Sequence, residues 1–553
     1  MIVDLRGDGV LDISDAKEIN DIEPSIRVEY NTYIEELLSL NKAQDLTWLL
    51  QVTSRNTHKS LIHDSFCRIK LLDNILKKVK TVDKVYIDSK FLKSACEQVI
   101  KINKSDAIIT IEKSSYFDSY IINLIKSCVY LCYSYFVPKF IVGRKNPLGP
   151  IVYIENFIFI DSFNQDGSLI DRYYPGLLQG VSNKKIKNKI WYVPTLIGIK
   201  TLWQYISIFK SIRKCKGNFI LKEDFLTLSD YMEAFKISIT LSKSIKNIPL
   251  WNNINVSDII NNELILEKGS PALINTILMY IFIKRLSLGN IDISLVIDWN
   301  ENQVIDRAIN LGFRKYYPGV KIKGYQGYVV PDYYACKDPT CYEIKAGTVP
   351  DEICVIGQGF VEGKKKYCKE INVSVAPAFR FSGIYGVERH DDLHNSVLVI
   401  LPISLKDSKN IILMCNNFLK LTNNKYELIL KQHPSYTVKN FIKLVPELLN
   451  PHFKVSNKPV HKLLANCDML ISSWSSVCLE AAVLGIPVAI SGSLSGPSMN
   501  PLYDLKEVKK WKICYNEKDL LNFIEGTSYH SKININNYFS PVTTKSINDF
   551  ICS

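Results

Sequence analysis

Short apolar runs alternate with longer amphipathic stretches along much of the chain, and the alternation is most regular in the last third. Apolar runs bounded by turn residues predict strands, and apolar positions every three or four residues predict helices. The strands expected there are 396–401, 428–431, 469–471 and 488–490, and the helices are 437–449, 459–466 and 475–484. This order is typical of a doubly wound α/β domain with a parallel sheet.

The first two-thirds of the chain is less regular. Residues 1–75 look mainly helical, and later apolar runs predict strands at 84–87, 107–111, 151–154, 157–160, 190–193, 294–297 and 354–357. A polar, charged run at 386–392 precedes the regular part and places a domain boundary near 385–395. We therefore expect an N-terminal α/β domain at 1–390, which begins with a helical extension, and a C-terminal domain at 391–553. Ligands of open parallel sheets bind beyond the carboxyl ends of the strands, so the loops that follow strands should carry the chemistry.

Composition narrows the class of protein. Of the 553 residues, 47% are hydrophobic and 22% are charged, which is typical of a globular chain. The formal net charge of +13 favours anionic partners. Lysines are spread along the chain and no nucleic-acid-binding motif occurs, so no nucleic acid is expected as a partner. The 14 cysteines include no CxxC pair, which predicts reduced, mostly buried thiols in a cytosolic protein and no zinc site.

Three segments bear on membrane contact. The first residues lack the apolar core of a signal peptide. The apolar stretches 127–137 and 271–283 are shorter than the roughly 20 residues that span a bilayer, so we expect buried core helices. The basic stretch 197–216 fits either a helix at a membrane surface or a helix packed on the sheet with its basic end in water. The expected location is cytoplasmic, with peripheral contact to the inner face of the membrane left open.

The loop after the predicted strand 428–431 carries a phosphate-binding pattern. Lys431 supplies an ammonium group and His433 an imidazole, and Pro434 holds the histidine in an extended conformation. Such groups can bind or protonate a leaving phosphate. The alternative is that His433 only ends the strand and Pro434 begins the next helix.

The loop after the predicted strand 469–471 is rich in serine. Ser472 and Ser473 come first, and Ser475 and Ser476 open the following helix. Serine caps helices, but a helix start with free N–H groups and hydroxyls also binds anions. Glu480, one turn into the helix, can hold a ribose hydroxyl or pair with a lysine.

The ordered set of these motifs resembles a known family. A His-Pro after a strand, a serine pair opening a helix that continues into Glu-Ala, and the run 485–488 (Gly-Ile-Pro-Val) are similar to the nucleotide-binding half of bacterial GT-B glycosyltransferases. The similarity points to users of CMP-sugars: sialyltransferases, polysialyltransferases, capsule Kdo transferases and surface carbohydrate biosynthesis proteins. It implies two Rossmann-like domains facing a cleft, with His433, Ser475 and Ser476 on the CMP phosphate. Ser472 and Ser473 remain a competing pair.

The resemblance also implies a general base in the N-terminal domain. The sialyltransferases carry an acidic-acidic-Gly motif, and the match here is Gln165-Asp166-Gly167, with glutamine at the first acidic position. Asp166 is therefore the predicted base, or simply part of a turn. Glu301, after the predicted strand 294–297, is the reserve base, or an acid favoured by a helix dipole.

The remaining site prediction concerns the acceptor side. Tyr325 and Gln326 lie in a glycine-flanked loop and are expected to face the substrate, unless they form an ordinary aromatic turn.

The expected function is transfer of an acidic sugar, a sialic-type nonulosonic acid or Kdo, from CMP to a hydroxyl of a bacterial surface glycan or lipid-linked glycan. No metal or other cofactor is expected, because the histidine, the lysine and the helix start neutralise the phosphate. The alternatives are a CDP-glycerol or UDP-sugar transferase of the same fold, and a non-catalytic protein that binds a glycan or a nucleotide.

Overall fold

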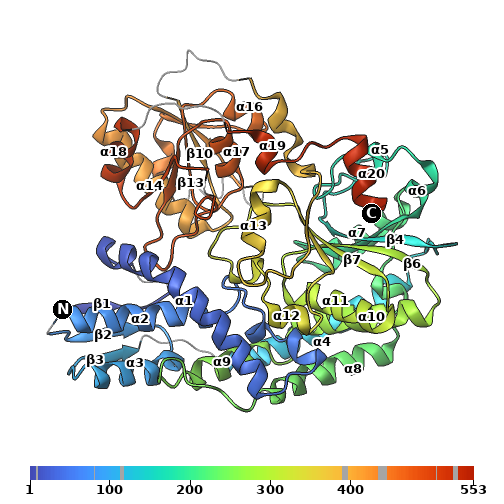
Figure 1. Cartoon of the computed structure of the whole chain (residues 1–553), viewed down its shortest axis with the longest axis horizontal. Coiled ribbons are helices and arrows are strands. Elements are labelled where there is room, and N and C mark those ends of the chain that lie inside the picture. The colour runs from blue at the N-terminus through green and yellow to red at the C-terminus, as the bar shows by residue number, and fades with distance from the viewer. Residues whose placement is uncertain are drawn as a thin grey trace.

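The computed structural model describes residues 1–7, 10–79, 81–111, 117–388, 396–433, 445–505, 507–526 and 533–552. These residues form three parallel sheets, two of six strands and one of three. The sheets lie in separate parts of the molecule, with the C-terminal sheet above the N-terminal elements at the left of Figure 1 and the other large sheet at the right.

The first large sheet has the strand order β5-β4-β6-β7-β8-β9. Its strands are β4 (Ile151–Ile158), β5 (Ile190–Leu196), β6 (Ile293–Trp299), β7 (Lys321–Gln326), β8 (Glu352–Val355) and β9 (Val373–Val375). The helices α10 (Pro271–Leu288) and α11 (Val304–Tyr316) pack against each other beside this sheet. The order corresponds to a doubly wound sheet of the 2-1-3-4-5 kind.

The C-terminal sheet has the order β12-β11-β10-β13-β14-β15, which is the 3-2-1-4-5-6 order of the Rossmann fold. Its strands are β10 (Ser396–Ile400), β11 (Glu427–Lys431), β12 (Phe453–Val455), β13 (Met469–Ser472), β14 (Val488–Ser491) and β15 (Trp511–Cys514). The helices of this part are α14 (Leu405–Leu421), α16 (Val460–Leu464), α17 (Val477–Val483) and α18 (Glu517–Glu525). Two doubly wound parallel domains confirm the predicted fold class.

The N-terminal extension is not only helical. A third parallel sheet is formed by β1 (Ile2–Asp4), β2 (Lys84–Ile87) and β3 (Ile108–Ile111). The helices α1 (Ile13–Leu40), α2 (Ile62–Lys78) and α3 (Lys90–Ile102) pack with it. The strand at residues 2–4 was missed because its apolar run is too short to stand out, and it is held by pairing with β2.

The last residues of the chain return to the first large sheet. After the C-terminal domain come α19 (Ile535–Tyr538), which contacts the loop after β8, and α20 (Thr544–Cys552), which lies where the C-terminus is marked in Figure 1. Lys323 Nζ donates a hydrogen bond to the Phe550 carbonyl at 2.8 Å. The Ser540 N–H donates to the Ile356 carbonyl at 2.6 Å. Residues 540–552 therefore pack with the N-terminal part, although the expected boundary put them in the second domain.

A buried ion network joins the N-terminal unit to the first large domain. Glu343, in α12 (Cys341–Lys345), accepts hydrogen bonds from both Arg55 and Arg307. Its side chain is 2% exposed, and those of the two arginines are 1% and 0% exposed. Burial alone would raise the pKa of Glu343, but the charges of Arg55 and Arg307 hold it below its usual value. The carboxylate thus stays charged and binds two arginines from distant segments.

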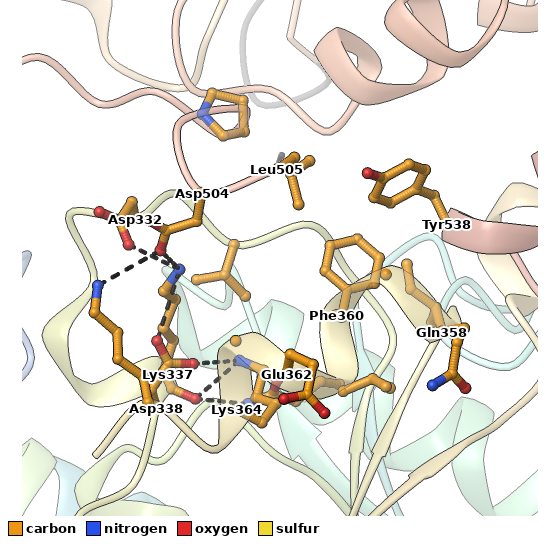
Figure 2. A pocket seen from close by; sticks show the side chains of 18 of the residues that line it. Asp332, Lys337, Asp338, Gln358, Phe360, Glu362, Lys364, Asp504, Leu505 and Tyr538 are labelled. Carbon is orange, nitrogen blue, oxygen red and sulfur yellow. Dashed lines mark hydrogen bonds and ion pairs between the residues drawn. The ribbon is translucent and has the colours of Figure 1, made fainter. Parts of the chain in front are cut away.

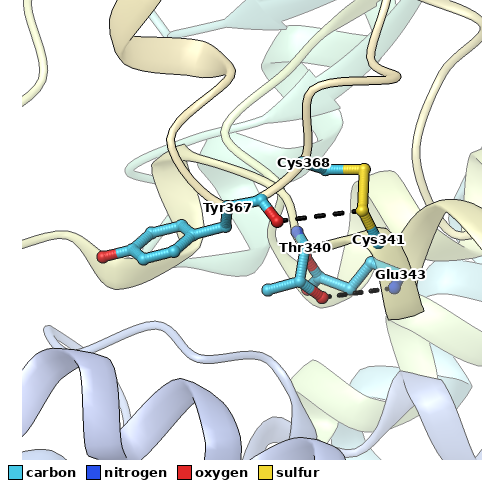
Figure 3. The surroundings of a disulfide bond; sticks show 5 residues. All are labelled: Thr340, Cys341, Glu343, Tyr367 and Cys368. Carbon is cyan, nitrogen blue, oxygen red and sulfur yellow. Dashed lines mark hydrogen bonds between the residues drawn. A yellow bond between two sulfur atoms is a disulfide. The ribbon is translucent and has the colours of Figure 1, made fainter.

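One cysteine pair departs from the expectation of reduced thiols. Cys341 and Cys368 form a disulfide across 27 residues, shown in Figure 3 beside Thr340, Glu343 and Tyr367. The spacing gave no CxxC signal, and only folding brings the two sulfur atoms together. Among the described residues the other twelve cysteines form no disulfide, and nine of them are buried.

The two apolar stretches have different surroundings. Both α4 (Phe117–Lys139) and α10 are long and apolar enough to cross a membrane, judged by length and composition. Of α10's apolar window 61% is buried, so the core helix predicted there is confirmed. Only 11% of the corresponding window in α4, residues 120–139, is buried. The prediction of a buried helix at 127–137 is therefore wrong, because no other part of the described chain covers one face of α4.

We expect Glu343→Gln to lower the urea midpoint of unfolding strongly. The change leaves two buried guanidinium groups without their carboxylate, a loss that typically costs about 3–5 kcal/mol. Tryptophan fluorescence would follow the transition. The control is Glu97→Gln, which breaks an exposed pair with Lys93 and should leave the midpoint unchanged. Equal midpoints for the two variants would contradict the importance of the network.

Candidate active site

A cleft of about 570 Å³ lies at the carboxyl edge of the C-terminal sheet. The loops after β10, β11 and β13 line it from the C-terminal domain. The segment that connects the two large sheets, η7 (Phe379–Gly386), lines it from the other side. The described lining residues are Arg380, Phe381, Gly383, Ile384, Ile400, Leu401, Pro402, Ile403, Lys431, Gln432, His433, Val460, His461, Trp474, Ser475, Ser476, Val477 and Glu480.

The loop after β11 brings a lysine and a histidine to this cleft. Lys431 Nζ donates a hydrogen bond to the Lys458 carbonyl at 2.8 Å, which holds the ammonium group in place. Burial lowers the pKa of His433 below its usual value, so the imidazole is neutral at physiological pH. A neutral imidazole can still donate one hydrogen bond to a phosphate oxygen. Pro434 lies outside the described residues.

The two serine pairs have different positions. Ser475 and Ser476 line the cleft, as the resemblance implies for a phosphate contact. The Ser472 hydroxyl is fully buried and donates to the Ile400 carbonyl at 2.9 Å, so it joins two strands. Ser473 lines a separate cavity of about 320 Å³. The geometry favours Ser475 and Ser476 over the competing pair.

The helix that follows these serines is short. α17 has only seven residues, so its dipole adds little to anion binding. The predicted helix start therefore contributes mainly its serine hydroxyls, and the positive charge comes from side chains around the cleft.

Glu480 projects into the same cleft from α17. Burial raises its pKa to about 7, and the positive charge of Arg380 opposes this rise. Near neutral pH the carboxyl is therefore partly protonated and can both donate and accept hydrogen bonds. A sugar or ribose hydroxyl can both donate and accept, so it can bond to this carboxyl in either protonation state.

Arg380 is the cleft residue that sequence reasoning missed. It is exposed, and its guanidinium carbon lies 5.6 Å from the centre of the Tyr173 ring and 5.8 Å from that of Trp299. The guanidinium is thus held over two rings of the first large domain, and Arg380 also lines the cleft. An arginine between Phe379 and Phe381, just before the polar boundary run, was the only signal in the sequence.

Glu301 lies close enough to Arg380 to be affected by its charge. Trp299 Nε1 donates to Glu301 Oε1 at 3.1 Å, and Gln303 Nε2 donates to the other carboxylate oxygen. Burial raises the pKa of Glu301, and these two hydrogen bonds, together with the charges of Arg380 and Lys59, counteract the rise. Arg380 thus acts on carboxyl groups of both large domains, Glu301 in one and Glu480 in the other.

Asp166 lies elsewhere. It is exposed in a turn, where its Oδ1 accepts hydrogen bonds from the Ser168 hydroxyl at 2.6 Å and from the Ser168 N–H at 2.9 Å. These bonds lower the pKa of Asp166, which makes it a weaker base. Asp166 is not among the described residues that line the cleft. Of the two predictions for Asp166, a general base or part of a turn, its placement fits the turn.

The two residues expected to face the substrate are both buried. Tyr325 is fully buried and its hydroxyl donates to the Pro377 carbonyl at 2.7 Å, so the expectation of a substrate contact is wrong for this residue. Tyr325 belongs to the strand β7, and its ring is packed against aromatic neighbours. Gln326 lines a different cavity of about 560 Å³, shown in Figure 2. There Lys337 already pairs with Asp332, and Lys364 with Asp338.

Three carboxyl groups lie together inside the first large domain. Oxygens of Glu155, Asp298 and Asp306 lie within 4.8 Å of one another, and all three side chains are buried. As a carboxylate, Asp298 finds no donor among the described residues, whereas a proton on it can be shared with Glu155 in a hydrogen bond. By ligand type this set could hold a divalent cation. Without a cation, burial and the neighbouring carboxyls raise the pKa of Asp298 far above its usual value, so the group holds a proton.

No family model and no characterised sequence matches the chain. Among solved structures it is similar to the lipopolysaccharide outer core galactosyltransferase WaaB, with 12% identity, 73% of this chain and 99% of that chain covered, and a TM-score of 0.39. It is also similar to the UDP-GlcNAc 2-epimerase of Methanocaldococcus jannaschii, with 11% identity, coverages of 72% and 98%, and a TM-score of 0.35. At such identities and TM-scores the likeness supports no conclusion about activity, and the fold class rests on the two sheets themselves.

We expect Asp298→Asn to raise the melting temperature, and to raise it more at pH 8 than at pH 5. The pKa of Asp298 is higher in the folded than in the unfolded protein, so stability is lost as pH rises from the unfolded value toward the folded one. Asparagine removes that loss. Calorimetry in EDTA would measure the shift.

The control for this change is Asp166→Asn, because the pKa of that exposed carboxyl is shifted in the opposite direction and its removal brings no gain. A lower melting temperature for Asp298→Asn in EDTA at pH 8 would contradict the protonated cluster. If added Mg²⁺ or Ca²⁺ raised the melting temperature of the unchanged protein but not that of Asp298→Asn, the cluster would instead hold a cation.

Proposed function

We propose that this protein transfers a sugar from a nucleotide-activated donor to a hydroxyl acceptor. The observation that carries the proposal is the cleft at the carboxyl edge of the C-terminal sheet. It gathers a lysine, two histidines, two serines and an arginine around one space large enough for a nucleotide-sugar. Four of these side chains are cationic or can become so, which suits a diphosphate or monophosphate donor.

The donor's phosphate is the group that we assign to Lys431, His433 and the serine pair. A leaving nucleotide gains negative charge as the glycosidic bond to phosphate breaks. Hydrogen bonds from the neutral imidazole and the serine hydroxyls, and the charge of Lys431, stabilise that developing charge. Glu480 is then placed to exchange hydrogen bonds with a hydroxyl of the nucleotide or of the sugar.

The chemical step needs one base. The acceptor hydroxyl oxygen attacks the anomeric carbon, the bond from that carbon to the phosphate oxygen breaks, and the nucleotide leaves with the electron pair. A carboxylate takes the acceptor's proton. We assign this role to Glu301. It is not one of the described residues that line the cleft, but it lies within electrostatic reach of Arg380, which does line it, and burial raises the pKa of Glu301. Asp166 stays the alternative suggested by sequence.

The finer proposal is a CMP-activated acidic sugar as donor. A sugar carboxylate brings a second negative charge, and Arg380 supplies a second positive group beside the phosphate-binding loop. The order of motifs that resembles CMP-sugar transferases supports the same choice. UDP-hexose and CDP-glycerol donors are the outcomes that would replace it.

Nucleotide binding tests the phosphate site. Calorimetry with CMP, CDP, UDP and GDP should show binding of CMP, and His433→Ala should weaken it about tenfold, since a hydrogen bond to a charged group is worth roughly 1.5–3 kcal/mol. The matched control is His452→Ala, a histidine just before β12, at the opposite edge of the sheet. Binding of UDP alone would overturn the donor choice, and equal effects of the two substitutions would overturn the site.

Transfer assays separate the two candidate bases. With the nucleotide-sugar that binds and a glycan acceptor, Glu301→Gln should lower kcat by about 100-fold or more, because a positioned general base typically contributes that factor. Asp166→Asn should keep the rate near that of the unchanged protein. The reverse pattern would return the role to Asp166. Nucleotide-sugar binding without transfer or hydrolysis would identify a binding protein instead of an enzyme.

A further inference from the structure

The helix α4 presents an unusual surface for a protein helix of its length. Its apolar side chains remain uncovered at Ile121, Ile125, Val129 and Phe136, each at least half exposed. The chain that follows continues this surface with Phe140 and Val142, which are 81% and 93% exposed. Uncovered apolar area of this extent is costly in water and marks an interaction surface.

A neighbouring helix extends the same surface. α8 (Leu228–Thr240) lies beside α4 in Figure 1 and contributes Met232, which is 67% exposed. Between the two helices is a groove of about 690 Å³, lined mainly by apolar side chains that include Leu131, Phe136 and Phe235. We call α4, α8 and residues 140–142 the docking face.

Basic side chains border the docking face. Lys126, Lys139 and Lys236 are exposed on its two helices. The Lys139 ammonium lies 5.1 Å from the centre of the Tyr135 ring, and that of Lys268 lies 5.6 Å from the Tyr120 ring. Among the described side chains of the two helices, the acids are Asp230, which pairs with Arg285, and Glu233. An apolar centre with a cationic border is typical of helices that lie in a membrane interface.

The helix lies flat against the protein and does not project from it. Ser127 Oγ donates to the Gly269 carbonyl at 2.6 Å, and Tyr130 donates to Asn275 Oδ1 at 3.0 Å. Farther along, the Tyr231 hydroxyl donates to the Ser134 carbonyl at 3.2 Å. One face of α4 is therefore attached to the domain along its length, and the opposite face is left for an external partner. This geometry suits a helix lying in a bilayer surface and not one that spans it.

We propose that the docking face binds the surface of a membrane that contains anionic lipids, with the apolar side chains among the acyl chains and the lysines at the headgroups. Charge decides between this partner and a second copy of the chain. Two copies would bring one basic border against another, whereas anionic headgroups neutralise it. The proposal rests on the exposed helices alone and does not depend on the assigned donor. Membrane binding through the docking face would bring the protein close to a lipid-linked acceptor.

Vesicle sedimentation with the full chain tests the proposal. Vesicles of phosphatidylcholine with phosphatidylglycerol should bind the protein, vesicles of phosphatidylcholine alone should bind it much less, and added salt should weaken the binding. The double variant Ile125→Asp/Val129→Asp should bind about tenfold more weakly or worse, because it places carboxylates where acyl chains would lie. Lys126→Glu/Lys139→Glu should weaken binding to the anionic vesicles only.

The matched control is Leu449→Asp, which puts the same charge on an exposed leucine of the C-terminal domain and should leave vesicle binding unchanged. Circular dichroism and nucleotide binding, both expected to be unaffected, show that the variants are folded and separate this test from that of the donor site. The proposal is overturned by absent or lipid-independent vesicle binding. It is also overturned if sedimentation equilibrium finds a dimer that the double variant dissociates.

Discussion

Parallel strand pairing is the constraint on which the arrangement of the site depends. Every strand pair in the two large sheets is parallel, so all loops that follow strands emerge at one edge of each sheet. Lys431, His433 and Ser475 are 44 positions apart at most, yet they share one cleft because β11 and β13 both flank β10. The connecting segment η7 then adds Arg380, whose charge reaches carboxyl groups on both sides.

Buried charges fall into two groups with different energetic consequences. Glu343 is matched by two arginines, so its burial is compensated and it joins segments far apart in sequence. Glu155 and Asp298 have no cation among the described residues near them, and burial is compensated by protons instead. The first arrangement keeps a charge in the folded protein and holds two parts of the molecule together. The second makes stability depend on pH.

The docking face exists because the protein has more apolar helix surface than its other described elements cover. The apolar windows of α10 and α4 have the same mean hydropathy, but 61% of the window in α10 is buried and only 11% of that in α4. The active-site proposal and the membrane proposal are independent. Together they describe an enzyme whose donor cleft lies at one domain edge, while its N-terminal half lies against the surface that would hold a lipid-linked acceptor.

The sequence by itself determined the elements whose signals are local. The strand and helix pattern predicted a doubly wound C-terminal domain and an α/β N-terminal domain, and the family resemblance implied that both are Rossmann-like. The loops after β11 and β13 could be recognised because strand ends and turn residues are adjacent in the chain. Tertiary structure alone decided which side chains share a space. Tyr325 became a core residue, Arg380 a cleft residue, Cys341 a partner of Cys368, and α4 an exposed helix. Each outcome depends on neighbours contributed by distant segments, and hydrophobic periodicity reports how apolar a face is, not what lies over it.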